Sequence, residues 1–237
     1  MKVAIIGSGN VGKALATSAT KAGHHVTLSA RSPEKAREAA QVSNAHAAPS
    51  NRDAVKDADL VVLAVPADKV DEVVGALAPE LDGKVIILAV PFEAIDEVAS
   101  TIGNRTDGKT VIDVTNVITP DMKGLAVGFT TSGAEEWQKK LPQAHVVKAF
   151  NYAFASKMAD PKVNGTRLDG FVAGDDEQAK QKALQFVESI GFRPVDAGPL
   201  AMARALEAMA SLNILLQIKH KWPWQNGWKL VGPPEEE

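Results

Sequence analysis

The residues whose types and spacing best suit a chemical role lie in the glycine-rich segment 7–12, which reads GSGNVG. The segment follows a short β-branched run and opens an amphipathic helix, the context in which a G-x-G-x-x-G spacing binds a dinucleotide. Gly7 permits a tight turn, Gly9 lets a pyrophosphate approach the backbone, and Gly12 allows close packing of helix on strand. The N-terminus of that helix then faces the phosphates. The alternative is a βα turn with a purely structural role.

The end of the second expected strand distinguishes NAD from NADP. An NAD-binding protein places Asp or Glu there, about 20 residues beyond the glycines, to accept a hydrogen bond from the ribose 2′-hydroxyl. This sequence has Ala30-Arg31-Ser32 instead. A guanidinium binds a 2′-phosphate through a charge-assisted fork, and a serine adds a further donor. We therefore expect NADP(H), the alternative being a solvated Arg31 and a Ser32 that only caps the helix beginning at Pro33.

Other candidate contacts follow further strands. Pro66, Pro91 and Asn116 each end a strand at the carboxyl edge, where ligands of open α/β sheets bind. We expect Thr115 and Asn116 at the nicotinamide end, although an Asn that only forms a turn is an equal alternative. The expected cofactor contacts are Gly7, Ser8, Gly9, Asn10, Val11, Gly12, Ala30, Arg31, Ser32, Ala64, Val65, Pro66, Pro91, Thr115 and Asn116.

The elements that must position these residues alternate between apolar strands and amphipathic helices. Continuous apolar runs such as 60–65 are typical of parallel strands covered on both faces. The predicted fold class is therefore α/β, a Rossmann-like doubly wound parallel sheet with a small C-terminal α/β and long-helix extension. The expected strands are 2–6, 25–30, 59–65, 84–90, 109–115 and 145–150, and the expected helices are 10–22, 33–41, 67–78, 92–102 and 133–141.

Two stretches of the sequence repeat at an offset of 25 residues. Ala64-Val65-Pro66 returns as 89–91, and the helical run 70–73 returns as 95–98. We interpret this as a duplicated strand-helix unit that adds a neighbouring strand to the sheet. The alternative is that unrelated βα units converge on similar words. The repeat leaves open whether Pro66 or Pro91 takes the position beside the cofactor ribose.

The pattern changes after residue 150. A strand at 170–174, a helix at 176–190, a short strand at 192–195 and a long helix at 199–220 are expected. We interpret 1–150 as an NADP-binding Rossmann domain and 151–232 as a C-terminal region that covers the substrate and forms a dimer interface. Residues 233–237 form an acidic tail, for which we expect disorder.

The composition of the 237-residue chain excludes several classes of protein. There is no cysteine, which rules out thiol chemistry, and the five histidines lack metal-ligand spacing, so we expect no metal. A net charge of -3 predicts no nucleic-acid partner. No apolar run reaches the roughly 18 residues that span a bilayer, so we expect no membrane partner. With no signal-peptide pattern at the start, the expected location is cytoplasmic.

Longer sequence motifs along the chain carry a family resemblance. They include the glycine segment, Ala30-Arg31, DVTN at 113–116, VVKAFN at 146–151 and RPVDAGPL at 193–200. Over nearly its whole length the chain resembles NADPH-dependent reductases of the deazaflavin coenzyme F420, and more distantly the nucleotide domain of six-transmembrane ferric reductases. The resemblance implies a homodimer with NADP(H) on the sheet, coenzyme F420 or another flavin as the small-molecule redox partner, and hydride transfer between nicotinamide C4 and deazaflavin C5.

Such a transfer depends on proximity and orientation and needs no acid-base residue. The catalytic residue is accordingly unknown, with Asn151 the one candidate, since the sequence holds no triad or carboxylate pair. Ser132 also has the capping-box spacing with Glu135, so a helix cap is its alternative role. The expected substrate contacts are Ser132, Asn151, Tyr152, Phe154, Gly198 and Pro199.

Charged residues of the second half have two expected roles. Arg204 and Glu207 lie one helical turn apart and predict an ordinary surface or interface pair. The cations available for the phosphate and anionic tail of F420 are Lys148, Lys157, Arg167 and Lys219. The alternative is that these cations are scattered solvated charges.

Two rival functions remain open. One is a small imine or carbonyl reductase of the 6-phosphogluconate dehydrogenase-like class, which requires a proton donor such as Lys148 or Asp196. The other is a non-catalytic NADP(H) sensor, for which we expect saturable cofactor binding without turnover of any acceptor.

Overall fold

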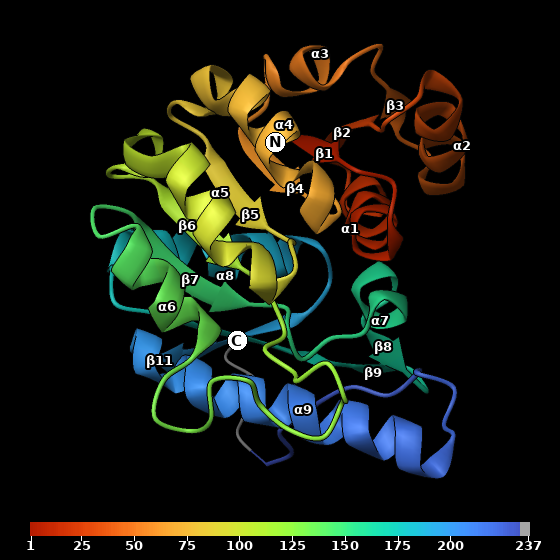
Figure 1. The fold of residues 1–237 in the computed structure, drawn as a ribbon. Coiled ribbons are helices and arrows are strands. Elements are labelled where there is room, and N and C mark those ends of the chain that lie inside the picture. The colour runs from red at the N-terminus through yellow and green to blue at the C-terminus, as the bar shows by residue number, and fades with distance from the viewer. Residues whose placement is uncertain (233–237) are drawn as a thin grey trace.

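One mixed sheet forms the centre of the protein (Figure 1). The structure is a computed structural model that describes residues 1–232, the side chains of Ala67 and Ala78 excepted, so the predicted acidic tail at 233–237 lies outside the described residues. Within residues 1–232 the sheet has nine strands, β1 (Lys2–Ile6), β2 (His25–Ser29), β3 (His46–Ala47), β4 (Leu60–Leu63), β5 (Val85–Leu88), β6 (Thr110–Asp113), β7 (His145–Ala149), β10 (Asp169–Gly174) and β11 (Arg193–Gly198).

The strand order is β11-β10-β7-β6-β5-β4-β1-β2-β3. The seven strands from β7 to β3 run parallel, β10 pairs antiparallel with β7, and β11 runs parallel to β10. The predicted Rossmann-like α/β class is confirmed. The repeated strand β5 lies between β4 and β6, with Leu88 beside both Leu63 and Asp113, so the repeat is a true member of the sheet.

Helices cover both faces of the sheet (Figure 1). One layer contains α1 (Asn10–Lys21), α2 (Pro33–Ser43) and α8 (Glu177–Ser189), and the other contains α3 (Asn51–Val55), α4 (Val70–Leu77), α5 (Ile95–Ile102) and α6 (Gly133–Lys140). The long helix α9 (Ala203–His220) runs along the bottom of the view, and α7 (Ala155–Ala159) packs against α1.

Two hydrophobic cores result from strand alternation. Because successive side chains point to opposite faces, Val62 and Ile87 join the core beneath α1 and α8, whereas Leu63 and Leu88 join the core beneath α4 and α5. All four side chains are fully buried. The carboxyl ends of β1, β4, β5 and β6 are thereby held at one edge of the sheet.

Several short elements were not predicted. They are β3, α3, α7 and the hairpin of β8 (Lys162–Val163) and β9 (Thr166–Arg167). Segments of two to five residues are too short to show a period, but the Asn164-Gly165 pair, with both φ angles positive, was an available hairpin signal. No helix within residues 1–232 is long and apolar enough to cross a membrane.

Burial of β5 on both faces generates the first prediction. Ile86→Ala and Ile87→Ala should each lower the free energy of unfolding by about 2–5 kcal/mol, because each removes a fully buried side chain from a different core. Urea unfolding measures both losses. The control Val42→Ala, on α2 and 75% exposed, should change stability by less than about 0.5 kcal/mol. A small effect at either isoleucine would contradict two-sided burial.

Candidate functional site

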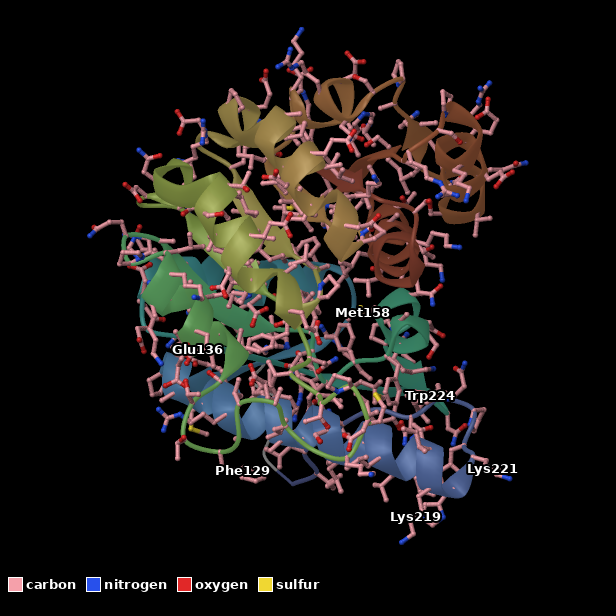
Figure 2. All side chains as sticks on the ribbon, in the orientation of Figure 1. Phe129, Glu136, Met158, Lys219, Lys221 and Trp224 are labelled. Atoms are coloured by element: carbon pink, nitrogen blue, oxygen red, sulfur yellow. The ribbon has the colours of Figure 1, made fainter. Side chains whose placement is uncertain are left out.

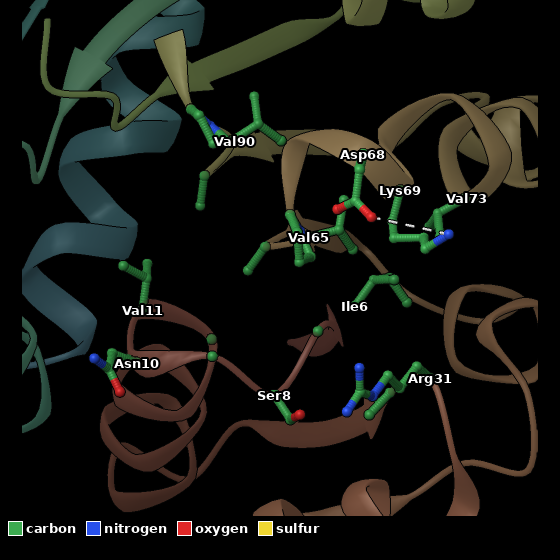
Figure 3. A pocket seen from close by; sticks show the side chains of 18 of the residues that line it. Ile6, Ser8, Asn10, Val11, Arg31, Val65, Asp68, Lys69, Val73 and Val90 are labelled. Atoms are coloured by element: carbon green, nitrogen blue, oxygen red, sulfur yellow. Dashed lines mark ion pairs between the residues drawn. The ribbon is translucent and has the colours of Figure 1, made fainter. Parts of the chain in front are cut away.

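A cavity of about 1040 Å³ opens at the carboxyl ends of β1, β2, β4, β5 and β6 (Figure 3). It exceeds the range of roughly 300–1,000 Å³ usual for small-ligand pockets. Of the expected cofactor contacts, all except Ser32 line this cavity. Both Pro66 and Pro91 lie in its wall, so each member of the repeat contributes to the same site.

Close backbone approaches shape the glycine turn. Gly7 has a φ of +116°, and a Cβ there would lie 2.0 Å from the carbonyl oxygen of Ala64. A Cβ on Gly12 would lie 2.5 Å from the carbonyl oxygen of Gly7. A Cβ on Gly9 meets nothing within 4 Å, although Gly9 lines the cavity. Gly7 and Gly12 therefore serve the packing of the turn, while Gly9 keeps the space above it open.

The N-terminus of α1 points at this open space. Gly9 is its N-cap and, within the described chain, no side chain caps the helix and no acidic residue stands in its first turn. The first backbone N–H groups of a helix have no intrahelical partner and carry a partial positive charge. This end of the cavity is therefore built to bind an anion such as a pyrophosphate.

Two cations stand beside the turn. Arg31 extends from the end of β2 into the cavity with its guanidinium directed toward Ser8, and Lys35 on α2 also lines the wall (Figure 3). Among residues 1–232, no hydrogen bond or ion pair holds either charged group. Sequence reasoning missed Lys35, whose signal was its place one turn into the helix that follows Arg31. Ser32 caps α2 instead of lining the cavity, because its Oγ accepts a hydrogen bond from Lys35 N at 3.3 Å.

The opposite wall comes from the segment after β4. Asp68 and Lys69 face the cavity there, with Lys69 Nζ 4.0 Å from Asp68 and 3.8 Å from Glu72 (Figure 3). These contacts are long and exposed, so they contribute little to stability. The further lining residues that sequence reasoning missed are Ile6, Asn51, Asp68, Lys69, Glu72, Val73, Ala89, Val90 and Val114. For the residues from Asp68 to Val90 the available signal was their place beside Pro66 and Pro91, whereas Ile6 and Val114 directly precede the predicted contacts Gly7 and Thr115.

The end of β6 is held by a buried ionic cluster. Lys148 Nζ contacts Asp113 Oδ2 at 2.8 Å, Glu207 Oε1 at 2.7 Å and the carbonyl oxygen of Thr115 at 2.7 Å. Asp113 Oδ1 accepts hydrogen bonds from Thr115 N at 2.9 Å and Thr115 Oγ1 at 2.7 Å. Asn116 follows, exposed in the cavity wall. The cluster thus lies directly behind the predicted nicotinamide end.

Burial and charge act against each other in this cluster. Burial acts to lower the pKa of the Lys148 ammonium, but Asp113 and Glu207 outweigh it, and the pKa is raised. Burial raises the pKa of the Glu207 carboxyl, and the adjacent Lys148 opposes that rise only in part. Lys148 is fully buried and does not line the cavity, so it cannot donate a proton to a substrate there.

The predicted pair of Arg204 with Glu207 is wrong. Arg204 instead makes a bidentate pair with Glu135 of α6, at 2.9 and 2.5 Å, whereas Glu207 turns inward to Lys148. Residues one turn apart on a helix share a face only approximately, and these two find closer partners on α6 and β7. The Arg204 pair joins α9 to α6, and the Glu207 pair joins α9 to β7.

None of the expected substrate contacts is among the residues that line the described cavity. Ser132 is fully buried and caps α6, accepting from Glu135 N at 3.1 Å and donating to Glu135 Oε2 at 2.7 Å. The Asn151 amide donates to the carbonyl oxygen of Leu206 at 3.0 Å. Ser132 is thus the helix cap that its capping-box spacing allowed.

The aromatic and edge candidates also have structural partners. Tyr152 is buried and its hydroxyl donates to the carbonyl oxygen of Phe171 at 3.0 Å, and burial raises the pKa of that hydroxyl. Phe154 packs edge-to-face on Trp224 with ring centroids 5.0 Å apart. Gly198 is the last residue of β11 and Pro199 follows it, and β10 and β7 separate this edge strand from β6.

Three of the four cations expected at a basic mouth are engaged inside the protein. Besides Lys148, Lys157 is buried and donates to the carbonyl oxygen of Lys162 at 2.9 Å, and Arg167 donates to the carbonyl oxygens of Gly191 and Phe192. The expectation is wrong for these three because their charged groups already donate to acceptors within the fold. Lys219 alone is exposed, at the solvent side of α9 (Figure 2).

Comparison with known proteins gives the family. The sequence model described as NADP oxidoreductase coenzyme F420-dependent matches residues 2–87 and 80–117. An F420-dependent NADP reductase of Methanocaldococcus jannaschii is 30% identical over 233 residues, covering 93% of this chain and 94% of that protein. The chain belongs to the F420-dependent NADP reductase family.

Two further proteins are similar to this chain. A crystal structure from Arthrobacter sp. FB24, assigned to the F420-dependent NADP reductases, is 25% identical, with a TM-score of 0.69 over 98% of this chain and all of that chain. Metalloreductase STEAP3 of Rattus norvegicus is 26% identical over 208 residues, which are 88% of this chain but 36% of that protein. The predicted resemblance to both groups is confirmed.

The glycine turn generates the second prediction. Gly9→Ala should weaken NADPH binding at least tenfold while leaving stability unchanged, because its methyl group enters only the open space above the turn. Gly12→Ala should destabilise the protein by about 1–3 kcal/mol, because its methyl group meets the carbonyl oxygen of Gly7. Fluorescence titration and urea unfolding measure the two effects. Unchanged NADPH affinity in a folded Gly9→Ala protein would refute a phosphate site there.

Proposed function

We propose that this protein is an NADP(H)-dependent oxidoreductase that transfers a hydride between nicotinamide and coenzyme F420. The observation that carries the proposal concerns Arg31 and Lys35, whose charged groups have no partner among residues 1–232 and lie beside a helix N-terminus that no side chain in that range caps, in a member of this family. The position that would hold a carboxylate in an NAD-binding protein holds a guanidinium instead. Cofactor choice and acceptor choice thus rest on separate grounds, the first on the site and the second on the family.

The cavity fits a dinucleotide laid across the strand ends. The pyrophosphate lies over Gly9 and the first turn of α1, where backbone N–H groups are free to donate. Arg31 and Lys35 bind the 2′-phosphate through charge-assisted hydrogen bonds. The nicotinamide half then extends past Pro66 and Pro91 to Thr115 and Asn116, which form the far part of the same wall.

The chemistry requires orientation more than proton transfer. When bound, NADPH would supply a hydride from nicotinamide C4 to C5 of F420, and N1 of F420 would take up one proton from water. The chain holds the nicotinamide against the end of β6, where Thr115 is fixed and Asn116 is free to donate or accept. Holding two reactants in a near-attack geometry accounts for most of the acceleration in such a reaction.

For the C-terminal region, we propose that residues 151–232 cover the acceptor and form the dimer interface. Met202, just before α9, and Leu212 and Ile218 on α9 face solvent, with 41%, 51% and 47% of each residue exposed. Apolar side chains gathered along one helix mark an interaction surface, here for a second copy of the chain.

We place the protein in the cytoplasm, since a chain without cysteine makes no use of an oxidising compartment.

The rival imine or carbonyl reductase lacks its proposed proton donors. Lys148 is buried in the ionic cluster, and Asp196 lies on the edge strand β11, paired with Lys180 at 3.0 Å. Neither side chain lines the cavity. The NADP(H) sensor differs from both enzymes in one observable, because it binds cofactor and turns over no acceptor.

Cofactor choice generates the third prediction. Arg31→Ala should weaken NADPH binding about 10-fold to 150-fold, since a hydrogen bond to a charged group contributes roughly 1.5–3 kcal/mol, and should leave NADH binding nearly unchanged. Lys35→Ala should shift the preference in the same direction. Lys69→Ala, which alters the opposite wall, is the matched control and should leave the NADPH to NADH ratio as it is. Equal losses of affinity for NADPH and NADH in Arg31→Ala would refute the assignment of Arg31 to the 2′-phosphate.

Acceptor choice generates the fourth prediction. NADPH deuterated at C4 should transfer its label stereospecifically to C5 of F420 under anaerobic conditions. A hydride that moves directly from carbon to carbon does not exchange with the protons of water. Mass spectrometry of the reduced F420 measures the label. Turnover of a small imine or carbonyl, with no label in F420, would move the protein to the rival enzyme class. Cofactor binding with no turnover of any acceptor would favour the sensor.

A further inference from the structure

The buried cluster behind β6 links three elements that are distant in sequence. Asp113 on β6 and Lys148 on β7 are paired in register, so their side chains lie on the same face of the sheet. Glu207 reaches them from α9. The side chains of all three residues are at most 1% exposed. The cluster is therefore separate from solvent, although Thr115 beside it lines the cavity.

Every donor of the Lys148 ammonium is used. An ammonium has three donors, and here they meet Asp113, Glu207 and the carbonyl oxygen of Thr115. Asp113 in turn binds the N–H and the hydroxyl of Thr115. The carbonyl oxygen, amide and side chain of Thr115 are thus all held by the Lys148 and Asp113 pair, which leaves Asn116 as the first free polar residue of this wall.

Helices α9 and α6 both contact this buried cluster. Glu207 Oε2 accepts a hydrogen bond from Gly133 N at 3.0 Å, at the start of α6. A Cβ on Gly133 would lie 2.7 Å from Val117 Cγ1, 3.3 Å from Glu207 Oε1 and 3.4 Å from Thr115 Oγ1. The absence of a side chain at Gly133 therefore lets the start of α6 touch the segment that follows β6.

Resting on the proposed function, we propose that Lys148, Asp113 and Glu207 are positioning residues that fix Thr115 and Asn116 against the nicotinamide end of NADP(H). They also couple this wall to α9. Burying an ion cluster is costly, and an apolar substitute of similar volume is often as stable. Its presence immediately behind a cavity wall is explained by geometry, because directional contacts hold the Thr115 backbone in one place and apolar packing does not.

The test compares two double variants that affect the same helices. Lys148→Met/Glu207→Gln removes both ends of the Lys148–Glu207 ion pair and leaves Asp113 its two bonds to Thr115. Glu135→Gln/Arg204→Met is the matched control, because this pair also joins α6 to α9 and contacts no residue of the cavity wall. Glu207→Gln alone is nearly isosteric, and it carries the test if the first double variant does not fold.

The readouts separate the nicotinamide half of the cofactor from its other half. Calorimetry measures the affinity for NADPH and for 2′,5′-ADP, which lacks the nicotinamide, and fluorescence anisotropy reports the restraint of the bound reduced nicotinamide. In Lys148→Met/Glu207→Gln we expect 2′,5′-ADP affinity within twofold of the unmodified protein, NADPH affinity reduced about tenfold and anisotropy lowered. Glu207→Gln should shift NADPH affinity and anisotropy in the same direction by less, and the control should change none of the three readouts.

Two results would overturn the proposal. One is a loss of 2′,5′-ADP affinity as large as that of NADPH, which would indicate general loosening of the fold. The other is an equal effect in the Glu135→Gln/Arg204→Met control, which would assign the effect to helix docking. None of these readouts needs F420. Failure of label transfer in the unmodified protein therefore refutes the acceptor without touching this result.

Discussion

The close backbone contact between the glycine turn and its neighbours is the constraint on which the rest of the site depends. Gly7 passes so near Ala64 that a side chain at position 7 would overlap its carbonyl group, and Gly12 presses against Gly7 in the same way. These contacts bring the start of α1 to the ends of β1 and β4. The helix N-terminus, the Arg31 loop and the ends of β4, β5 and β6 can then surround one cavity.

The cations discussed above fall into two groups, which differ in whether their hydrogen-bond donors already have partners within the fold. Lys148, Lys157 and Arg167 each donate hydrogen bonds to carboxylates or carbonyl oxygens within the fold. Arg31 and Lys35 are exposed at the cavity and hold no such partner among the described residues. A cation that already has partners would lose them on binding a ligand anion, whereas a solvated cation gives up only water. This difference separates structural from binding cations more clearly than residue type does.

The repeated strand-helix unit enlarges the site instead of interrupting it. Because β5 pairs in parallel with both β4 and β6, its carboxyl end reaches the same edge as theirs. Pro66 and Pro91 therefore have equivalent positions, each three residues beyond the end of its strand and each lining the cavity. A repeat inserted at an edge of the sheet would have left the second proline far from the glycine turn.

The sequence by itself determined the longer strands and helices and their order along the chain, the glycine turn, the position of Arg31 and the family, because these depend on local spacing and on motifs that run along the chain. The substrate side was different: Ser132, Asn151 and Tyr152 are engaged by partners inside the fold. Lys148 meets Asp113 across 35 positions, and Glu207 meets Gly133 across 74. Burial and pairing over such separations arise only when the sheet assembles, so only the tertiary structure decided which polar residues remain free to bind a ligand.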